Sequence, residues 1–131
     1  MEFSPQKIKM TIGGIQVVVQ LKPNRTAQAV VDALPVEASA NQWGEEFYCN
    51  LPGVKDYREV ATTQVKVGDV AFWGMGGMLA VFFGRTPMSL GDDPVPADRV
   101  NVIGKVIGDP KVLLGAMGAS MMKVERLPEG I

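Results

Sequence analysis

A chain of 131 residues is long enough to bury a core of its own as one domain, so it needs neither disulfides nor a metal to fold. Its net charge is -1, with basic residues scattered among acidic ones, which argues against a nucleic-acid partner. The chain has no histidine, which excludes Ser-His and Cys-His nucleophile pairs and histidine metal ligands. We expect neither a metal nor a cofactor.

The sequence also predicts the cellular location of the protein. No stretch approaches the roughly 20 apolar residues that a membrane-spanning helix requires, and the first residues contain no apolar run. The single cysteine, Cys49, excludes an internal disulfide and is typical of a reducing compartment. We expect a cytoplasmic protein without a membrane partner, folded as one domain over residues 1–131 with loose ends at about 1–6 and 128–131.

The first predicted elements are a β-hairpin and a short helix. Apolar side chains alternate with polar ones over residues 7–12 and 15–21, and Gly13-Gly14 between them is typical of a two-residue turn. Apolar residues at 27, 30, 31 and 34 then follow helical spacing, with either Asn24 or Thr26 as the N-cap and Pro35 as the stop.

The next segment places carboxylates beside aromatic rings. Residues 36–40 alternate as a strand and lead into WGEEFYCN, residues 43–50. Glu45 and Glu46 lie on opposite faces of that segment, so whichever face points inward carries one carboxylate with it. Such a buried carboxylate must be hydrogen-bonded or shifted in pKa, which indicates a functional group. The alternative is a glutamate at the wet mouth of a barrel, paired with an arginine.

The middle of the chain predicts a sheet that is buried on both faces. After a polar connection over residues 51–63, a short strand is expected at 64–67. Two apolar strands, 70–73 and 78–83, follow and are joined by a Gly-rich turn. Because the second strand is apolar on both alternating faces, we expect something to pack against the outer wall of a small barrel.

The last third of the chain contains a long loop and three further elements. The aspartates of the loop over residues 86–99 favour a solvated turn over a cation site, because their spacing does not match a calcium loop. A strand at 100–107, a short helix from Pro110 to Gly115 capped by Asp109, and a strand at 120–127 complete about eight strands and two helices.

The central motifs resemble the cyclophilin fold, in which a segment of the form SQFFI-T leads through a loop into HVVFGKVxEGMDVV. In this chain LAVFFGRT, residues 79–86, leads through a loop into VNVIGKVIGDPKVL, residues 100–113. The likeness is greater to a small bacterial and archaeal family of minimal cyclophilin-like proteins of unknown function. The matching motifs are WGEEFY (43–48), VGDVAFW (67–73), FFGRTPM (82–88) and VNVIGKV (100–106). The resemblance implies a mainly β fold, a closed eight-stranded antiparallel barrel of the cyclophilin type with a short helix over each end.

The resemblance implies less about activity. Cyclophilins that isomerise X-Pro bonds carry an arginine at about the place where this chain has Glu45 and Glu46, and their pocket tryptophan and histidine are also not evident here. A carboxylate there cannot supply the stabilisation that the arginine gives. Arg85 is a candidate substitute, although an ion pair with Asp92 or Asp93 is the favoured interpretation. Whether the chain is an enzyme stays open.

The first hypothesis is a binding module for a small molecule or a short peptide, in which paired carboxylates favour a cationic or amine-bearing ligand. The alternatives are a prolyl isomerase of reduced activity, an enzyme with Glu45 or Glu46 as general base, and a homo-oligomer driven by surface contacts. The candidate ligand-binding residues are Trp43, Glu45, Glu46, Tyr48, Trp73, Phe82, Phe83, Arg85 and Met88.

Overall fold

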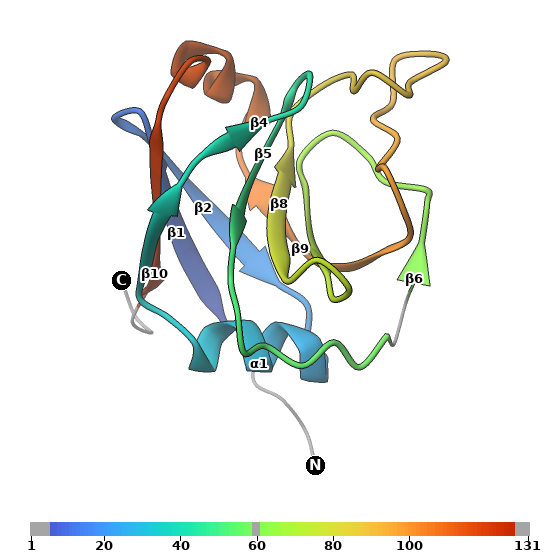
Figure 1. The fold of residues 1–131 in the computed structure, drawn as a ribbon. Helices are drawn as coiled ribbons and strands as arrows, with labels where there is room; N and C mark the ends of the chain where they lie inside the picture. Colours follow the sequence, from blue (N-terminus) through green and yellow to red (C-terminus); the bar gives the residue numbers. More distant parts are fainter. Residues whose placement is uncertain (1–5, 59–60, 128–131) are drawn as a thin grey trace.

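The computed structural model describes residues 6–58 and 61–127, which form an antiparallel sheet with two short helices (Figure 1). The loose ends predicted at 1–6 and 128–131 lie outside the described residues, apart from Gln6. The Gln6 carbonyl accepts a hydrogen bond from the amide of Leu21 at 2.9 Å, so this residue is already held against the sheet. None of the described helices is long and apolar enough to cross a membrane.

The described sheet has ten strands, and every pairing in it is antiparallel. Its hydrogen-bonded order is β3-β10-β1-β2-β9-β7-β8-β5-β4, with β6 paired to β9 beside this path. The strands are β1 (Lys7–Ile12), β2 (Ile15–Leu21), β3 (Val36–Ser39), β4 (Asn41–Gln42), β5 (Glu46–Asn50), β6 (Ala61–Thr62), β7 (Asp69–Trp73), β8 (Met78–Phe82), β9 (Val100–Ile107) and β10 (Met121–Leu127).

The expected closure into an eight-stranded barrel is not confirmed. The order of the sheet ends at β3 on one side and at β4 on the other, and within the described strands no ladder joins these two ends. The two end strands are nevertheless consecutive in sequence, separated only by Ala40, so the sheet curls until its edges approach each other (Figure 1). The chain itself, rather than strand pairing, bridges the gap.

The predicted hairpin and first helix are confirmed. Gly13 and Gly14 form the turn between β1 and β2 with φ values of 56° and 82°, which glycine adopts without a steric penalty. Helix α1 (Arg25–Asp32) begins at Asn24, whose side chain accepts a hydrogen bond from the amide of Ala27 at 2.8 Å. The cap is therefore Asn24 and not Thr26, and the helix packs an apolar stripe against the sheet.

Two later elements differ in detail from the prediction. The second helix is a 3₁₀ helix, η1 (Pro110–Ala116), which is capped by Asp109 as expected but ends one residue after Gly115. Residues 64–67 are not a strand; the short strand in this region is β6. The reason is a local turn, in which the amide of Lys66 donates to the Asp69 carboxylate at 2.8 Å and the amide of Asp69 donates to the Lys66 carbonyl at 3.0 Å.

The sheet carries a buried cluster on each of its faces, which confirms that β8 is covered on both sides. The main core fills the inside of the curled sheet and includes Leu79, Val81 and Phe83. The second cluster, here called the outer cluster, lies on the opposite face of β7, β8 and β9. It consists of Val65, Ala71, Ala80, Phe82, Val100 and Val102, with Tyr48 and Trp73 packed against it.

Candidate functional site

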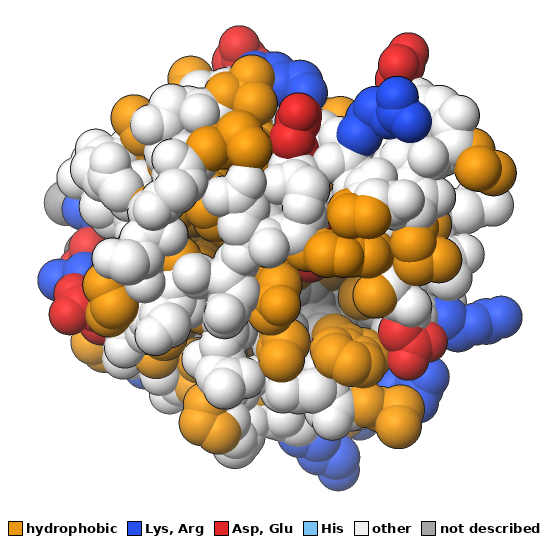
Figure 2. Space-filling view, turned by 45° about the horizontal axis from the view of Figure 1, so that its top comes forward, with side chains coloured by type: hydrophobic (Ala, Val, Ile, Leu, Met, Phe, Trp, Pro, Cys, Tyr) orange, Lys and Arg blue, Asp and Glu red, His pale blue; other side chains and the backbone are white. Residues whose placement is uncertain are grey.

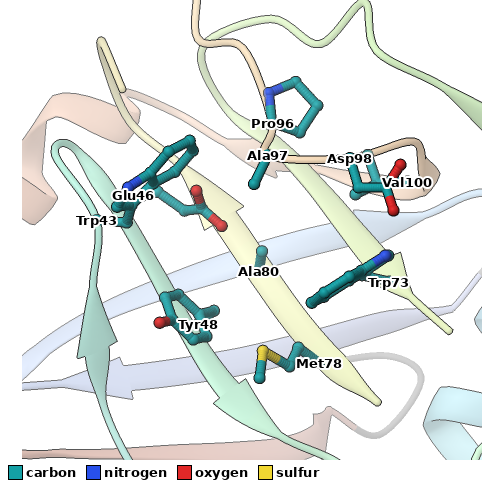
Figure 3. Close-up of a pocket in the computed structure, with 10 residues that line it drawn as sticks. All are labelled: Trp43, Glu46, Tyr48, Trp73, Met78, Ala80, Pro96, Ala97, Asp98 and Val100. Carbon is teal, nitrogen blue, oxygen red and sulfur yellow. The ribbon is translucent and has the colours of Figure 1, made fainter. Parts of the chain in front are cut away.

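A pocket opens at the edge of the outer cluster. Its volume is about 210 Å³, and it is lined by Trp43, Glu46, Tyr48, Trp73, Met78, Ala80, Pro96, Ala97, Asp98 and Val100 (Figure 3). The surface is hollowed where hydrophobic side chains gather on the face shown in Figure 2. Four of the candidate residues, Trp43, Glu46, Tyr48 and Trp73, are thus brought together in one place.

The floor of the pocket follows from the strand register. In the β5-β8 ladder, Glu46 pairs with Phe82, Tyr48 with Ala80 and Asn50 with Met78. Residues directly opposite each other in antiparallel strands share a face, as do residues two apart in one strand. Glu46, Tyr48, Ala80 and Met78 therefore all point away from the main core. Trp73, at the end of β7, pairs with Met78 and extends the same face.

The tight turn between β4 and β5 brings Trp43 to the side of Glu46. The amide of Trp43 donates to the carbonyl of Glu46 at 3.0 Å, so these two residues are opposite each other across the turn. Gly44 occupies the turn with a φ of 62°, in the left-handed region that favours glycine. Simple alternation along residues 43–50 would separate Trp43 from Glu46, whereas the turn places both at the pocket.

Glu46 is the buried carboxylate of the site. Only 8% of its surface is exposed, and its Oε1 atom is buried without a hydrogen-bond partner among the described residues. Desolvation by burial raises the pKa of Glu46 to about 7. In Figure 3 its carboxylate points into the pocket next to the ring of Trp43, with Trp73 on the opposite wall. The group can accept a proton or a hydrogen bond near neutral pH.

The remaining wall comes from the loop before β9. Thr86, which is 5% exposed, fixes this loop because its hydroxyl donates to the Val95 carbonyl at 2.6 Å and accepts from the Val95 amide at 3.2 Å. Pro96 and Ala97 follow directly and cover the pocket, and Asp98 lies near Trp73 (Figure 3). The exposed side chain of Asp98 adds a second carboxylate at the rim.

Glu45 lies elsewhere, as a residue of the β4-β5 turn. Its carboxylate forms an ion pair with Lys111 of η1, with 3.2 Å between Oε1 and Nζ. Its amide donates to the Arg85 carbonyl at 2.8 Å, and its carbonyl accepts from the Phe83 amide at 2.9 Å. The two neighbouring glutamates therefore have different surroundings, and Glu46 is the one that lines the pocket.

The two phenylalanines are buried beside the site and do not line it. Phe82 belongs to the outer cluster, whereas Phe83 packs into the main core and stacks on Phe47 with 5.1 Å between the ring centroids. Both side chains are fully buried. They support the sheet beneath the pocket, and their part in ligand binding stays a prediction.

Arg85 and Met88 lie on the exposed loop after β8. Arg85 donates from Nη2 to the Ser89 carbonyl at 3.3 Å, and Asp93 pairs with Lys66 at 2.8 Å instead of with Arg85. Met88 is 51% exposed. Neither side chain is among the described residues that line the pocket. The substitute cation considered for an isomerase is therefore not next to Glu46.

Sequence reasoning missed six lining residues. Met78 and Ala80 were assigned to the predicted strand without a role, although their register with Asn50 and Tyr48 places them on the pocket face. Three others, Pro96, Ala97 and Asp98, belong to the loop and have no periodic signal. The last, Val100, begins the strand predicted at 100–107 but was given no role there. Among the described residues, no group of three or more Cys, Asp or Glu is placed to hold a metal ion.

Comparison with known proteins agrees with this architecture. A model of the cyclophilin-like family matches residues 6–125, and the chain belongs to this family. The chain is also similar to a hypothetical protein of Archaeoglobus fulgidus whose structure was solved in solution. The two share 32% sequence identity with a TM-score of 0.79, over 94% of this chain and 95% of that chain. A search of the curated proteins found no match.

Proposed function

We propose that this chain is a binding protein that holds a small molecule or a segment of a short peptide in the pocket around Glu46. One observation carries the proposal: a carboxylate with 8% exposure, whose Oε1 has no partner in the described part of the chain, points into a cavity of about 210 Å³. Burying a carboxylate without a partner lowers stability, and such costs are typical of functional sites.

The composition of the walls supports the same proposal. Ligand pockets are commonly lined by aromatic and apolar side chains with a small number of placed polar groups. Here Trp43, Tyr48, Trp73 and Met78 supply apolar surface, and Glu46 is the buried polar group among them. A ligand that fills the pocket shields the indole rings from water and gives Glu46 a partner.

Binding can be followed through the tryptophans, because the sequence contains two and both line the pocket. A fragment screen by NMR should find ligands that shift the indole N–H signals of Trp43 and Trp73 in a saturable way. Trp73→Leu should weaken the binding of such ligands by about tenfold, because the variant loses a large contact surface. If no fragment in the screen shifts either indole signal, the proposal is contradicted.

Isomerase activity is the second candidate and has a separate test. An apolar pocket alone can favour the twisted form of an X-Pro bond by desolvating it, although the arginine that usually assists is absent from this one. An NMR exchange assay on an X-Pro peptide should show no rate above background. A clear rate in the wild type that Trp73→Leu abolishes and Arg85→Ala leaves unchanged would favour the isomerase instead. Separately from the isomerase question, we propose a cytoplasmic location and a single domain over residues 1–131.

A further inference from the structure

The pocket combines aromatic walls with carboxylates. Of its ten described lining residues, Trp43, Tyr48 and Trp73 are aromatic, Glu46 and Asp98 are acidic, and none is lysine or arginine. The faces of aromatic rings attract cations, most strongly when water is excluded. A neutral or anionic ligand would leave Glu46 uncompensated, whereas a cation is attracted both by the carboxylates and by the rings.

The buried Oε1 atom of Glu46 can accept a hydrogen bond in addition to pairing with a positive charge. Its Oε1 atom is buried and accepts no hydrogen bond from any described residue. Hydrogen bonds in which a partner is ionised are shorter and about twice as strong as neutral ones. A group that is both positively charged and carries N–H bonds therefore satisfies Glu46 fully. A quaternary ammonium offers only the charge, and an alcohol offers only the donor.

The size of the pocket limits what can accompany this group. An engineered apolar cavity of about 150 Å³ holds benzene. A volume of about 210 Å³ therefore admits an ammonium group with a short alkyl chain, including the end of a lysine side chain. The apolar part would lie on the pocket floor around Ala80 and Met78, between the rings of Trp43 and Trp73 (Figure 3).

We infer that the ligand carries a primary or secondary alkylammonium group, whose N–H donates to Glu46 Oε1 while its alkyl part packs between Trp43 and Trp73. The inference rests on the proposed function and narrows it to one ligand class. The same group occurs on small amines and on the lysine side chains of peptides, so both sources are included in the test.

The first arm compares probes that share an n-butyl chain and differ in the polar head. The indole N–H signals of Trp43 and Trp73 are followed while n-butylamine, n-butanol or n-butyltrimethylammonium is added at about pH 8.5, where Glu46 is ionised. We expect n-butylamine to bind at least about tenfold more tightly than either other probe, because only it supplies both charge and N–H. A capped lysine tripeptide, with its Nζ-acetylated form as control, shows whether peptides share the site.

The second arm removes one carboxylate at a time. Glu46→Gln keeps the shape of the side chain and removes its charge, and it should weaken n-butylamine binding by about tenfold or more. Glu45→Gln is the matched control, because that neighbouring carboxylate pairs with Lys111 outside the pocket, and it should change binding by less than about twofold. Wild-type affinity should also fall between about pH 8.5 and about pH 5.5, as Glu46 becomes protonated.

The outcomes separate this inference from the function on which it rests. If n-butanol binds as tightly as n-butylamine, or if Glu46→Gln leaves amine affinity unchanged, the ligand class is wrong although the pocket still binds ligands. If no probe and no library fragment shifts either indole signal, the proposed function and the inference are both overturned. Saturable amine binding that depends on Glu46 and not on Glu45 supports both.

Discussion

At the scale of single residues, the burial of Glu46 is unfavourable for stability. The side chain is 8% exposed, one of its oxygens has no partner among the described residues, and burial raises its pKa to about 7. A residue whose charge is this poorly compensated costs free energy of folding at neutral pH, unless a ligand supplies the missing partner. Under the proposed function, a bound cation would offset this cost.

Because burial raises the pKa of Glu46, the free energy of unfolding should depend on pH. The pKa of Glu46 is about 7 in the folded state, compared with 4.5 for a glutamate free in water, so the folded state binds the proton more tightly. Between these pH values the folded state is more protonated than the unfolded state, and each rise in pH lowers the free energy of unfolding. Across this window the loss amounts to about 3 kcal/mol at most, at about 1.36 kcal/mol per pH unit.

Glu46→Gln removes this group, so the variant should gain stability relative to wild type as pH rises from about 5 to about 8. Urea unfolding at both pH values measures the difference. Glu45→Gln is the control, because it removes the same charge outside the pocket. A gain of the same size in the control, or no gain in Glu46→Gln, would contradict the assignment.

At the scale of elements, the β4-β5 turn decides the layout of the site. Its two central residues, Gly44 and Glu45, reverse the chain, so that Trp43 and Glu46 face each other and both reach the pocket. Strand β5 then continues with Phe47 and Cys49 in the main core and Tyr48 at the pocket. A turn of a different length would move the aromatic ring away from the carboxylate.

Gly44→Ala tests the turn. A Cβ atom on Gly44 would lie 2.8 Å from the Arg85 carbonyl oxygen and 3.0 Å from the Thr86 Cα, which are backbone atoms that cannot move aside cheaply. Gly53 also has a positive φ, of 82°, but a Cβ there meets nothing within 4 Å. Both alanine variants pay about 1 kcal/mol for the left-handed backbone, and Gly44→Ala should lose at least about 1 kcal/mol more.

Urea unfolding of the two glycine variants gives this comparison directly. Because the clash is with the backbone of residues 85 and 86, Gly44→Ala should also shift the amide signals of those residues, whereas Gly53→Ala should not. Equal losses of stability in the two variants would show that the turn is not packed as described.

At the scale of the whole molecule, the pocket exists only because distant parts of the chain meet on the outer face of the sheet. Its floor comes from β5, β7 and β8, and its cover comes from the loop before β9. Thr86 joins the two ends of this loop through hydrogen bonds of 2.6 and 3.2 Å to Val95, and Lys66 holds its middle through Asp93. The cover is thus held by a contact within the loop and by a contact with the turn before β7.

Thr86→Val should loosen the cover without changing the pocket lining. The substitution keeps the shape of the side chain and leaves the carbonyl and amide of Val95 without their partner, which costs about 1 to 3 kcal/mol. Amide hydrogen exchange at Val95 should accelerate, and amine binding should weaken. Thr63→Val, at an exposed threonine, is the control. Unchanged exchange at Val95 would show that other contacts hold the loop.

The sequence by itself determined the elements whose signals are local. Alternation around Gly13-Gly14 predicted the first hairpin, helical spacing after Asn24 predicted α1, and the two-sided apolar pattern of β8 predicted a second buried layer. Its motifs also indicated the cyclophilin-like family. These local predictions agree with the structure because each depends on side-chain period, caps or turns within a few residues of each other.

Only the tertiary structure decided which glutamate lines the pocket, that Asp98 joins it, and that the described sheet ends at β3 and β4 without pairing. Alternation distinguishes two faces of a strand but does not say which one is inside, and a tight turn resets the pattern at Gly44. Loop residues such as Asp98 have no period at all. Their place is fixed by contacts such as that of Thr86 with Val95, made only when the chain is folded.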